Sequence, residues 1–305
     1  MFSKFLVPLD GSEVAERALP TAMKLARKGQ GDVTLLRVPR VHPVKVDATS
    51  GGTGWLYPDQ AEERTLADAR AYLKDVRERW AAENIPVHTK VVSGDPASVI
   101  LDMATSLDVD LICMTTHGYS GLTRWMLGSV TERVLRAAPC AVMVIREDCP
   151  MRRVLIALDG SALAEQALQP GLEVAHRLGA HVTLMQVATA VPVPHDVIFE
   201  LELAEGGIAD LLAADTIENA KTYLSVVAKR AARYGIPLET HVDIGSAAER
   251  IIDYSADNEI DLVVMATHGR SGLRRWAYGS VTEKVLRSSQ CALLVVRSPK
   301  EKLGK

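Results

Sequence analysis

The chain has little of what marks a metal protein or a disulfide-linked one. Its 305 residues include four cysteines, and no two of them form a C-x-x-C pair. Closely paired cysteines are the usual signature of a zinc site or a disulfide framework. We therefore expect neither a metal site nor a disulfide scaffold. Cys140 and Cys291 precede apolar runs, where a thiol is usually a small buried apolar group.

Long apolar runs and a strong net charge are also missing. No run reaches the roughly eighteen residues that a membrane span needs, and the first residues, MFSKFLVPLDGS, lack the layout of a signal peptide. The formal net charge of −3 gives no broad attraction to nucleic acid or anionic lipid. These features predict a cytoplasmic protein that binds neither nucleic acid nor a membrane.

Two common nucleotide-binding motifs are absent as well. There is no G-x-x-x-x-G-K-[ST] P-loop and no Rossmann G-x-G-x-x-G, and the glycines of residues 51–54 (GGTG) have loop composition only. The composition, with 48% apolar and 24% charged residues, is that of an ordinary globular protein. A length of 305 residues favours two domains.

What the sequence does have is an internal repeat. Residues 6–12 (LVPLDGS) return as residues 155–161 (LIALDGS), at an offset of 149. Residues 116–136 match residues 267–287 at sixteen of twenty-one positions, at an offset of 151. A repeat of this length indicates two copies of one domain. We place them at residues 1–147 and 151–298.

Short apolar runs and helical periods alternate along each copy. Four runs per copy are rich in Val, Ile and Leu without alternation, as in parallel strands covered on both faces, and a fifth alternates like an edge strand. The strands are expected at 4–9, 33–38, 87–91, 109–114 and 141–145, and at 153–158, 182–187, 238–242, 260–265 and 292–296. The pattern predicts an α/β fold of two tandem doubly wound domains, each a five-stranded parallel sheet of order 3-2-1-4-5 with helices on both faces.

Helix faces and helix starts support this assignment. Leu66, Ala69, Leu73, Val76 and Trp80 share one helical face, which Ile217, Ala220, Leu224, Val227 and Ala231 repeat. Asp95 before Pro96 is expected to be an N-cap, and Ser246 with Glu249 forms a capping-box pattern. Two long stretches, 39–60 and 188–210, are irregular, and such loops are either functional or disordered.

Two segments in each copy are candidates for ligand binding, because both follow strands at the carboxyl edge of the sheet. The first is Asp10-Gly11-Ser12, repeated as Asp159-Gly160-Ser161. Taken alone, this triplet favours a turn with a serine helix cap. The second ends in residues 128–131 (GSVT), repeated at 279–282. Glycine there lets backbone N–H groups approach a phosphate, and the Ser and Thr hydroxyls can donate to it.

The alternative for the second segment is a helix N-cap at Ser129 and at Ser280. Both interpretations hold together, because an N-cap site is also an anion site. His117 and His268 lie near the proposed phosphate position, but the sequence shows no carboxylate or nucleophile to go with them. We therefore expect no catalytic residues and no bound metal.

At these residues the sequence resembles the universal stress protein family, over nearly the whole chain and twice. The family pattern after strand four is G-x-x-G, nine residues, then G-[S/T]. Gly118, Gly128 and Ser129 match its last three fixed positions, as do Gly269, Gly279 and Ser280. Thr115 and Ala266 stand where the pattern has its first glycine.

The resemblance implies that the loop wraps the phosphates of ATP, that the Asp after strand one reaches the nucleoside, and that a residue ending strand two borders the adenine. The nucleotide-binding residues so implied are Pro8, Leu9, Asp10, Val38, Met114, Gly118, Gly128, Ser129, Val130 and Thr131, then Ala157, Leu158, Asp159, Val187, Met265, Gly269, Gly279, Ser280, Val281 and Thr282.

The departures at the first glycine bear on this expectation, since family members that lack the loop do not bind ATP. Ala266 adds one methyl group, whereas Thr115 is β-branched and stiff, so the second site is expected to be the more competent. The main hypothesis is a tandem universal stress protein that binds ATP, with Mg²⁺ as a candidate companion, or a related adenine nucleotide, as a regulatory ligand.

The rival hypothesis is a scaffold that binds no nucleotide and acts through protein partners. A third possibility is an enzyme with at most slow ATP hydrolysis. The resemblance also implies that the two domains pair through their last strands as an internal pseudo-dimer, and that the chain can form a homodimer. The sequence does not name a regulatory partner.

Overall fold

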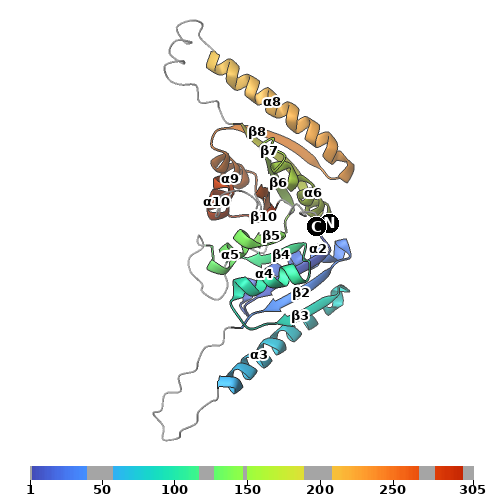
Figure 1. The fold of residues 1–305 in the computed structure, drawn as a ribbon. Helices are drawn as coiled ribbons and strands as arrows, with labels where there is room; N and C mark the ends of the chain where they lie inside the picture. The colour runs from blue at the N-terminus through green and yellow to red at the C-terminus, as the bar shows by residue number, and fades with distance from the viewer. Residues whose placement is uncertain are drawn as a thin grey trace, which may run out of the picture. The chain divides into compact units, whose positions relative to one another are not determined.

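The computed structural model describes residues 2–39, 58–116, 127–146, 150–188, 208–267 and 279–297 (Figure 1). The chain divides into two compact units, Met1–Asp148 and Cys149–Lys305. Residues 147–149 lie outside the described ranges, so the expected domain boundary stays a prediction.

Each unit contains a parallel sheet of five described strands. In the first unit these are β1 (Lys4–Leu9), β2 (Asp32–Arg37), β3 (Val87–Val91), β4 (Leu111–Thr115) and β5 (Ala141–Ile145). In the second they are β6 (Arg153–Leu158), β7 (His181–Ala188), β8 (Leu238–Ile244), β9 (Leu262–Thr267) and β10 (Ala292–Arg297). The orders β3-β2-β1-β4-β5 and β8-β7-β6-β9-β10 confirm the expected 3-2-1-4-5 in both units.

Helices connect the strands. The first unit has α1 (Glu13–Glu16), α2 (Ala18–Gly29), α3 (Pro58–Arg79), the 3₁₀ turn η1 (Ala81–Glu83), α4 (Pro96–Ser106) and α5 (Ser129–Ala137). The second has η2 (Ala164–Ala167), α6 (Leu168–Leu178), α8 (Ile208–Ala231), η3 (Ala232–Tyr234), α9 (Ala247–Asp257) and α10 (Ser280–Ser288). Right-handed crossovers place α2 and α3 on one face of the sheet and α4 and α5 on the other.

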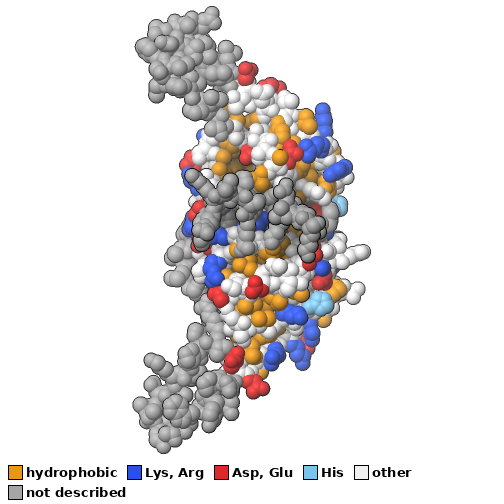
Figure 2. Space-filling model, viewed as in Figure 1, with side chains coloured by type: hydrophobic (Ala, Val, Ile, Leu, Met, Phe, Trp, Pro, Cys, Tyr) orange, Lys and Arg blue, Asp and Glu red, His pale blue; other side chains and the backbone are white. Residues whose placement is uncertain are grey.

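The predicted apolar faces are buried against the sheets. Ala69, Leu73 and Val76 are buried in α3, which lies along β2 and β3 (Figure 1). The central strand β4 is buried at every residue, whereas β3 alternates between half-buried and exposed positions, as expected of an edge strand. Outside the core, acidic, basic and apolar side chains are interspersed on the face drawn in Figure 2. In the described part of the chain, no helix is both long enough and apolar enough to span a membrane.

An aspartate ties the start of the first strand to the start of the fourth in both units. Asp110 Oδ2 accepts hydrogen bonds from the backbone N–H groups of Ser3 (2.7 Å) and Lys4 (2.9 Å). Asp261 Oδ2 accepts in the same way from the N–H groups of Arg152 (2.6 Å) and Arg153 (2.9 Å). These bonds align β1 beside β4, and β6 beside β9.

The two expected helix caps have different outcomes. Asp95 is the N-cap of α4 and accepts from Ser98 N at 2.9 Å, as predicted. Ser246 is the N-cap residue of α9, but its side chain makes no capping bond. Glu249 instead accepts from Lys284 of α10 at 2.6 Å. The N-cap position is therefore confirmed, but the expected capping bond from the Ser246 side chain is not formed.

Candidate functional site

The sheet order reverses between β1 and β4, and between β6 and β9. In doubly wound sheets, ligands bind at the carboxyl ends of the strands beside such a reversal. In the first unit this edge brings together the end of β1, the end of β4 and the start of α5, since Gly128 N donates to Thr116 O at 2.8 Å. The candidate site is built from these segments, and the second unit repeats it.

The Asp-Gly-Ser segments form capped turns. Asp10 Oδ1 accepts from Ser12 N at 3.0 Å and from Ser12 Oγ at 2.6 Å, and Ser12 Oγ accepts from Ala15 N at 3.1 Å. In the second unit Asp159 Oδ1 accepts from Ser161 N at 2.9 Å, and Ser161 Oγ from Ala164 N at 3.0 Å. The interpretation as a turn with a serine cap is confirmed.

The glycine of each turn is required by its backbone. Gly11 has φ +83° and Gly160 has φ +80°, the left-handed region that side chains disfavour. The turns therefore hold Asp10 and Asp159 at the sheet edge in a fixed conformation.

The helices after β4 and β9 begin one residue earlier than expected. The N-caps are Gly128 and Gly279, not Ser129 and Ser280, and neither glycine position has a side-chain capping bond. The first intrahelical bonds run from Glu132 N to Gly128 O (2.9 Å) and from Glu283 N to Gly279 O (3.1 Å). The N–H groups of the first three helical residues precede these bonds, so the helix itself supplies them no acceptor. They are suited to an anion.

The threonine of the first loop has a structural role. Thr131 is buried, with 3% of its surface exposed, and its Oγ1 donates to Thr115 O at 2.9 Å. A hydroxyl has one proton to donate, so in this conformation Thr131 donates to the backbone, and its expected contact with a phosphate stays a prediction. Thr282, its counterpart, is equally buried.

The second unit leaves a hydroxyl unused at the same edge. Thr267, the last residue of β9, is 3% exposed, and its Oγ1 has no hydrogen-bond partner among the described residues. Buried hydroxyls usually have a partner. Among the described residues, the two units therefore differ in the hydrogen bonds of the threonine hydroxyls at this edge.

The two departures from the family glycine do not strain the backbone. Thr115 and Ala266 are strand residues, and neither is among the described residues with positive φ. A positive φ would require glycine, and neither position has one. Thr115 and Ala266 therefore differ from the family glycine only in side-chain volume. Thr115 is buried, whereas Ala266 is half-buried.

The other predicted residues lie on the same strand ends. Leu9, Leu158, Met114 and Met265 are buried, and Pro8, Ala157, Val38 and Val187 are half-buried. On the helices, Ser129 and Ser280 are exposed, and Val130 and Val281 are half-buried. Gly118 and Gly269, with His117 and His268, lie outside the described residues.

Comparison with known proteins gives this edge a family context. The model of the universal stress protein family matches the chain twice, at residues 1–146 and 150–297. The chain belongs to the universal stress protein family. Universal stress protein YxiE of Bacillus subtilis is 33% identical over 151 residues, covering 48% of this chain and 100% of that protein.

Two further likenesses span both units of this universal stress protein. Universal stress protein Slr1230 of Synechocystis sp. is 26% identical over 315 residues, covering 96% of this chain and 99% of its own. The crystal structure of a universal stress protein from Archaeoglobus fulgidus has a TM-score of 0.67 at 21% identity, over 96% of this chain and 98% of that one. The tandem arrangement and the fold are therefore shared with known family members.

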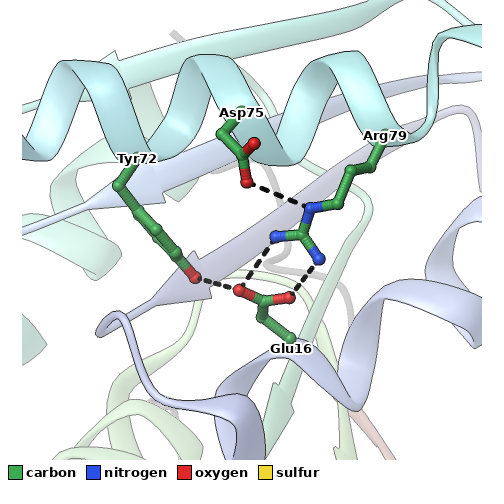
Figure 3. A network of polar contacts seen from close by, with 4 residues as sticks. All are labelled: Glu16, Tyr72, Asp75 and Arg79. Atoms are coloured by element: carbon green, nitrogen blue, oxygen red, sulfur yellow. Dashed lines mark hydrogen bonds and ion pairs between the residues drawn. The ribbon is translucent and has the colours of Figure 1, made fainter.

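A polar network behind the first turn of this family member was missed from the sequence. Tyr72 and Arg79 extend from α3 toward Glu16 of α1 (Figure 3). Tyr72 Oη donates to Glu16 Oε1 at 2.9 Å, and Arg79 donates to both carboxylate oxygens at 2.8 and 3.1 Å. The contacts join residues at least 56 positions apart, which no local pattern shows.

The repeat could have pointed to this network. Its counterparts in the second unit are Glu165, Tyr223 and Arg230, three identical residue types at the repeat offsets. Arg230 Nη2 donates to Glu165 Oε2 at 2.8 Å. The Tyr223 hydroxyl is buried and forms no hydrogen bond of acceptable geometry with a described residue.

Proposed function

We propose that this universal stress protein binds ATP or a related adenine nucleotide at the carboxyl edge of each sheet, as a regulatory ligand in a stress response. The observation that carries the proposal is the duplicated helix start at the sheet reversal. The N-caps of α5 and α10 are Gly128 and Gly279, so no N-cap side chain accepts from the first N–H groups of either helix. Free N–H groups and the positive helix end favour a phosphate at this place.

The fit of a phosphate is supported by Gly279. Its φ is −54°, which any residue adopts, and a Cβ built on it would meet no atom of the described residues within 4 Å. Neither conformation nor packing among those residues therefore calls for glycine here. Glycine is also a favoured N-cap residue, and a ligand that approaches the backbone closely supplies a second reason for it.

The fixed turns support a nucleoside beside the phosphate. Asp10 and Asp159 follow the central strands, and the family resemblance assigns this aspartate to the nucleoside. Mg²⁺ is proposed only as a companion of the phosphates, because this ion is usually held by few protein carboxylates together with phosphate oxygens. Pairing of the units through their last strands and self-association of the chain stay predictions from the resemblance.

The rival function, a scaffold without nucleotide, is favoured for the first unit by one observation. The Thr131 hydroxyl donates its proton to Thr115 O, so in this conformation it does not donate to a ligand. In that case the first unit would act by binding protein partners. Slow ATP hydrolysis would need a base that the described residues do not identify.

The test is direct binding by the intact chain. Nucleotide that co-purifies with the protein is extracted and identified, and ATP with Mg²⁺ is then titrated by calorimetry. We expect saturable binding with a Kd below millimolar. No binding at millimolar ATP by protein with a cooperative thermal transition would overturn the proposal and favour the scaffold.

A further inference from the structure

The two units differ in charge beside the same turn. At the repeat offset of 149, Arg17 of the first unit corresponds to Gln166, and Arg37 corresponds to Gln186. The replacements are both from a permanent cation to a neutral amide. Residues 37 and 186 matter most, because they lie on the strands next to β1 and β6.

Arg37 places a positive charge at the first turn. It is the last residue of β2, and its Nη1 donates to Leu9 O, the last carbonyl of β1, at 3.4 Å. Its Nη2 lies 3.3 Å from the position of a Cβ on Gly11. Below it, Cζ stands 5.9 Å from the centre of the Tyr72 ring, within range of a cation–π contact. Among the described residues, Arg37 forms no ion pair with a carboxylate.

Gln186 occupies the corresponding position in the second unit without the charge. Its Nε2 lies 3.9 Å from the position of a Cβ on Gly160. Its Oε1 is buried and has no hydrogen-bond partner in the described part of the chain, and the same holds for Gln166 Oε1. A buried acceptor without a donor is costly, and a ligand that donates a hydrogen bond would remove this cost.

The surrounding charges sharpen the difference. Arg79 pairs with Glu16 through two hydrogen bonds, so Arg37 adds a further positive charge beside the first turn. Arg230 likewise pairs with Glu165, which leaves Asp159 beside the neutral Gln186. Burial is the largest cause that raises the pKa of both Tyr223 and Tyr72, but the charge of Asp159 raises the pKa of Tyr223 further, whereas the charge of Arg37 lowers that of Tyr72. The second turn therefore disfavours an anion and the first tolerates one.

We propose that residues 37 and 186 set the ligand class of each unit. The first unit takes a nucleotide with an additional anionic group on its nucleoside, such as a ribose phosphate, which Arg37 binds. The second takes a nucleotide whose nucleoside presents hydrogen-bond donors there, which Gln186 and Asp159 accept. This rests on the proposed nucleotide binding and adds a different specificity for each unit.

The test uses two probes with equal numbers of phosphate groups, adenosine 3′,5′-bisphosphate and ADP. Each is titrated by calorimetry into the full chain as wild type, Arg37→Gln, Gln186→Arg and Arg27→Gln, the last removing a cation that pairs with Glu83 away from the turn. We expect one bisphosphate site per wild-type chain. Arg37→Gln should lower the affinity for bisphosphate relative to ADP by about tenfold or more, the loss of one charge-assisted contact.

Gln186→Arg should add a second bisphosphate site, and Arg27→Gln should behave as wild type. Thermal unfolding of every variant establishes that it is folded before titration. Equal bisphosphate-to-ADP ratios in wild type and folded Arg37→Gln, with ADP still bound, would overturn this inference and leave the proposed function intact. If neither probe nor ATP binds the folded wild type, the proposed function fails, and this inference with it.

Discussion

Glu16 is the residue on which the contacts between α1 and α3 converge. The hydrogen bonds from Arg79, followed by the one from Tyr72, lower the pKa of the Glu16 carboxyl, although partial burial acts in the opposite direction. Burial and the bond to Glu16 raise the pKa of Tyr72 well above its usual value, so the phenol stays a donor. The arrangement holds a charged carboxylate between two donors.

A prediction follows for Glu16→Gln. The neutral amide keeps one acceptor oxygen but loses the charge that Arg79 binds, so we expect a loss of about 1 to 2 kcal/mol in the free energy of unfolding at pH 7, after allowance for the exposure of Arg79. Because the folded pKa is below the unfolded one, the wild-type advantage is full above the unfolded pKa and is lost as pH falls through the folded pKa. Urea unfolding at pH 7 and pH 3.5 measures it.

The matched control is Glu78→Gln on the same helix. Its carboxylate lies 3.8 Å from Lys74 Nζ with both side chains more than 60% exposed, so little change is expected. An equal effect of the two substitutions, or a Glu16→Gln effect that does not shrink toward pH 3.5, would contradict the assignment of a special role to Glu16.

Gly279 gives a second prediction at this scale. Gly279→Ala should lower the unfolding transition only slightly, because the backbone angle is ordinary and the described surroundings leave room, and only the poorer capping by alanine counts against it. The methyl group would nevertheless keep a phosphate from the helix end, so we expect ATP affinity in the second unit to fall at least tenfold. Calorimetry and thermal unfolding measure the two effects.

The control is Gly31→Ala, where the new Cβ would lie 2.4 Å from Ser3 O. That substitution should destabilise the fold by about 1 to 3 kcal/mol, as overpacking does. If Gly279→Ala destabilises like Gly31→Ala and ATP affinity is unaffected, then the glycine serves packing and not a ligand.

At the scale of elements, the role of the start of α10 can be tested by removing a single backbone N–H group. Ser280 is its first helical residue, and proline is well tolerated there, because φ suits it and its N–H has no intrahelical acceptor. Gly279 before it has ψ 144°, which a following proline allows. Ser280→Pro should therefore keep the helix and remove one phosphate donor.

We expect Ser280→Pro to weaken ATP binding several-fold with an unchanged unfolding midpoint. Ser280→Ala is the partner variant, since it removes the hydroxyl and keeps the N–H. A loss with Ser280→Ala alone would assign the contact to the hydroxyl and contradict binding by the helix N-terminus. Calorimetry with ATP distinguishes the two.

The elements themselves were accessible from the sequence because their causes are local and duplicated. Apolar runs without alternation gave the central strands, and the alternation of residues 87–91 gave the edge strand β3. The turn at Gly11 was also foreseen, since its serine cap is encoded within three residues. A period or a motif was sufficient in each case.

Contacts between distant segments were not accessible in this way. The bond from Ser3 N to Asp110 and the bond from Tyr72 to Glu16 depend on how strands and helices meet, not on local spacing. The helix start at Gly128 was misplaced for a related reason. A serine looks like the better cap by its side chain, but the strand end holds Gly128 through Thr116 O.

At the scale of the whole molecule, duplication has left two edges that are alike in backbone and different in side chains. The first edge has Thr115 in place of the family glycine and a Thr131 hydroxyl already bound to its carbonyl. The second has the smaller Ala266 and a Thr267 hydroxyl that has no hydrogen-bond partner among the described residues. ATP itself is therefore expected to bind the second unit more tightly.

The occupancy of the two units can be separated by their turn aspartates in the intact chain. Asp159→Ala should remove the tighter ATP site, whereas Asp10→Ala should leave it, because each aspartate accepts from the serine N–H of its own turn. Asp159→Asn, which keeps an acceptor for Ser161 N, separates loss of the turn from loss of the charge. Calorimetric stoichiometry and Kd for ATP are the readouts. If Asp10→Ala abolishes ATP binding while Asp159→Ala leaves it unchanged, the order of the two units is reversed, and the volume at Thr115 is no obstacle to the nucleotide.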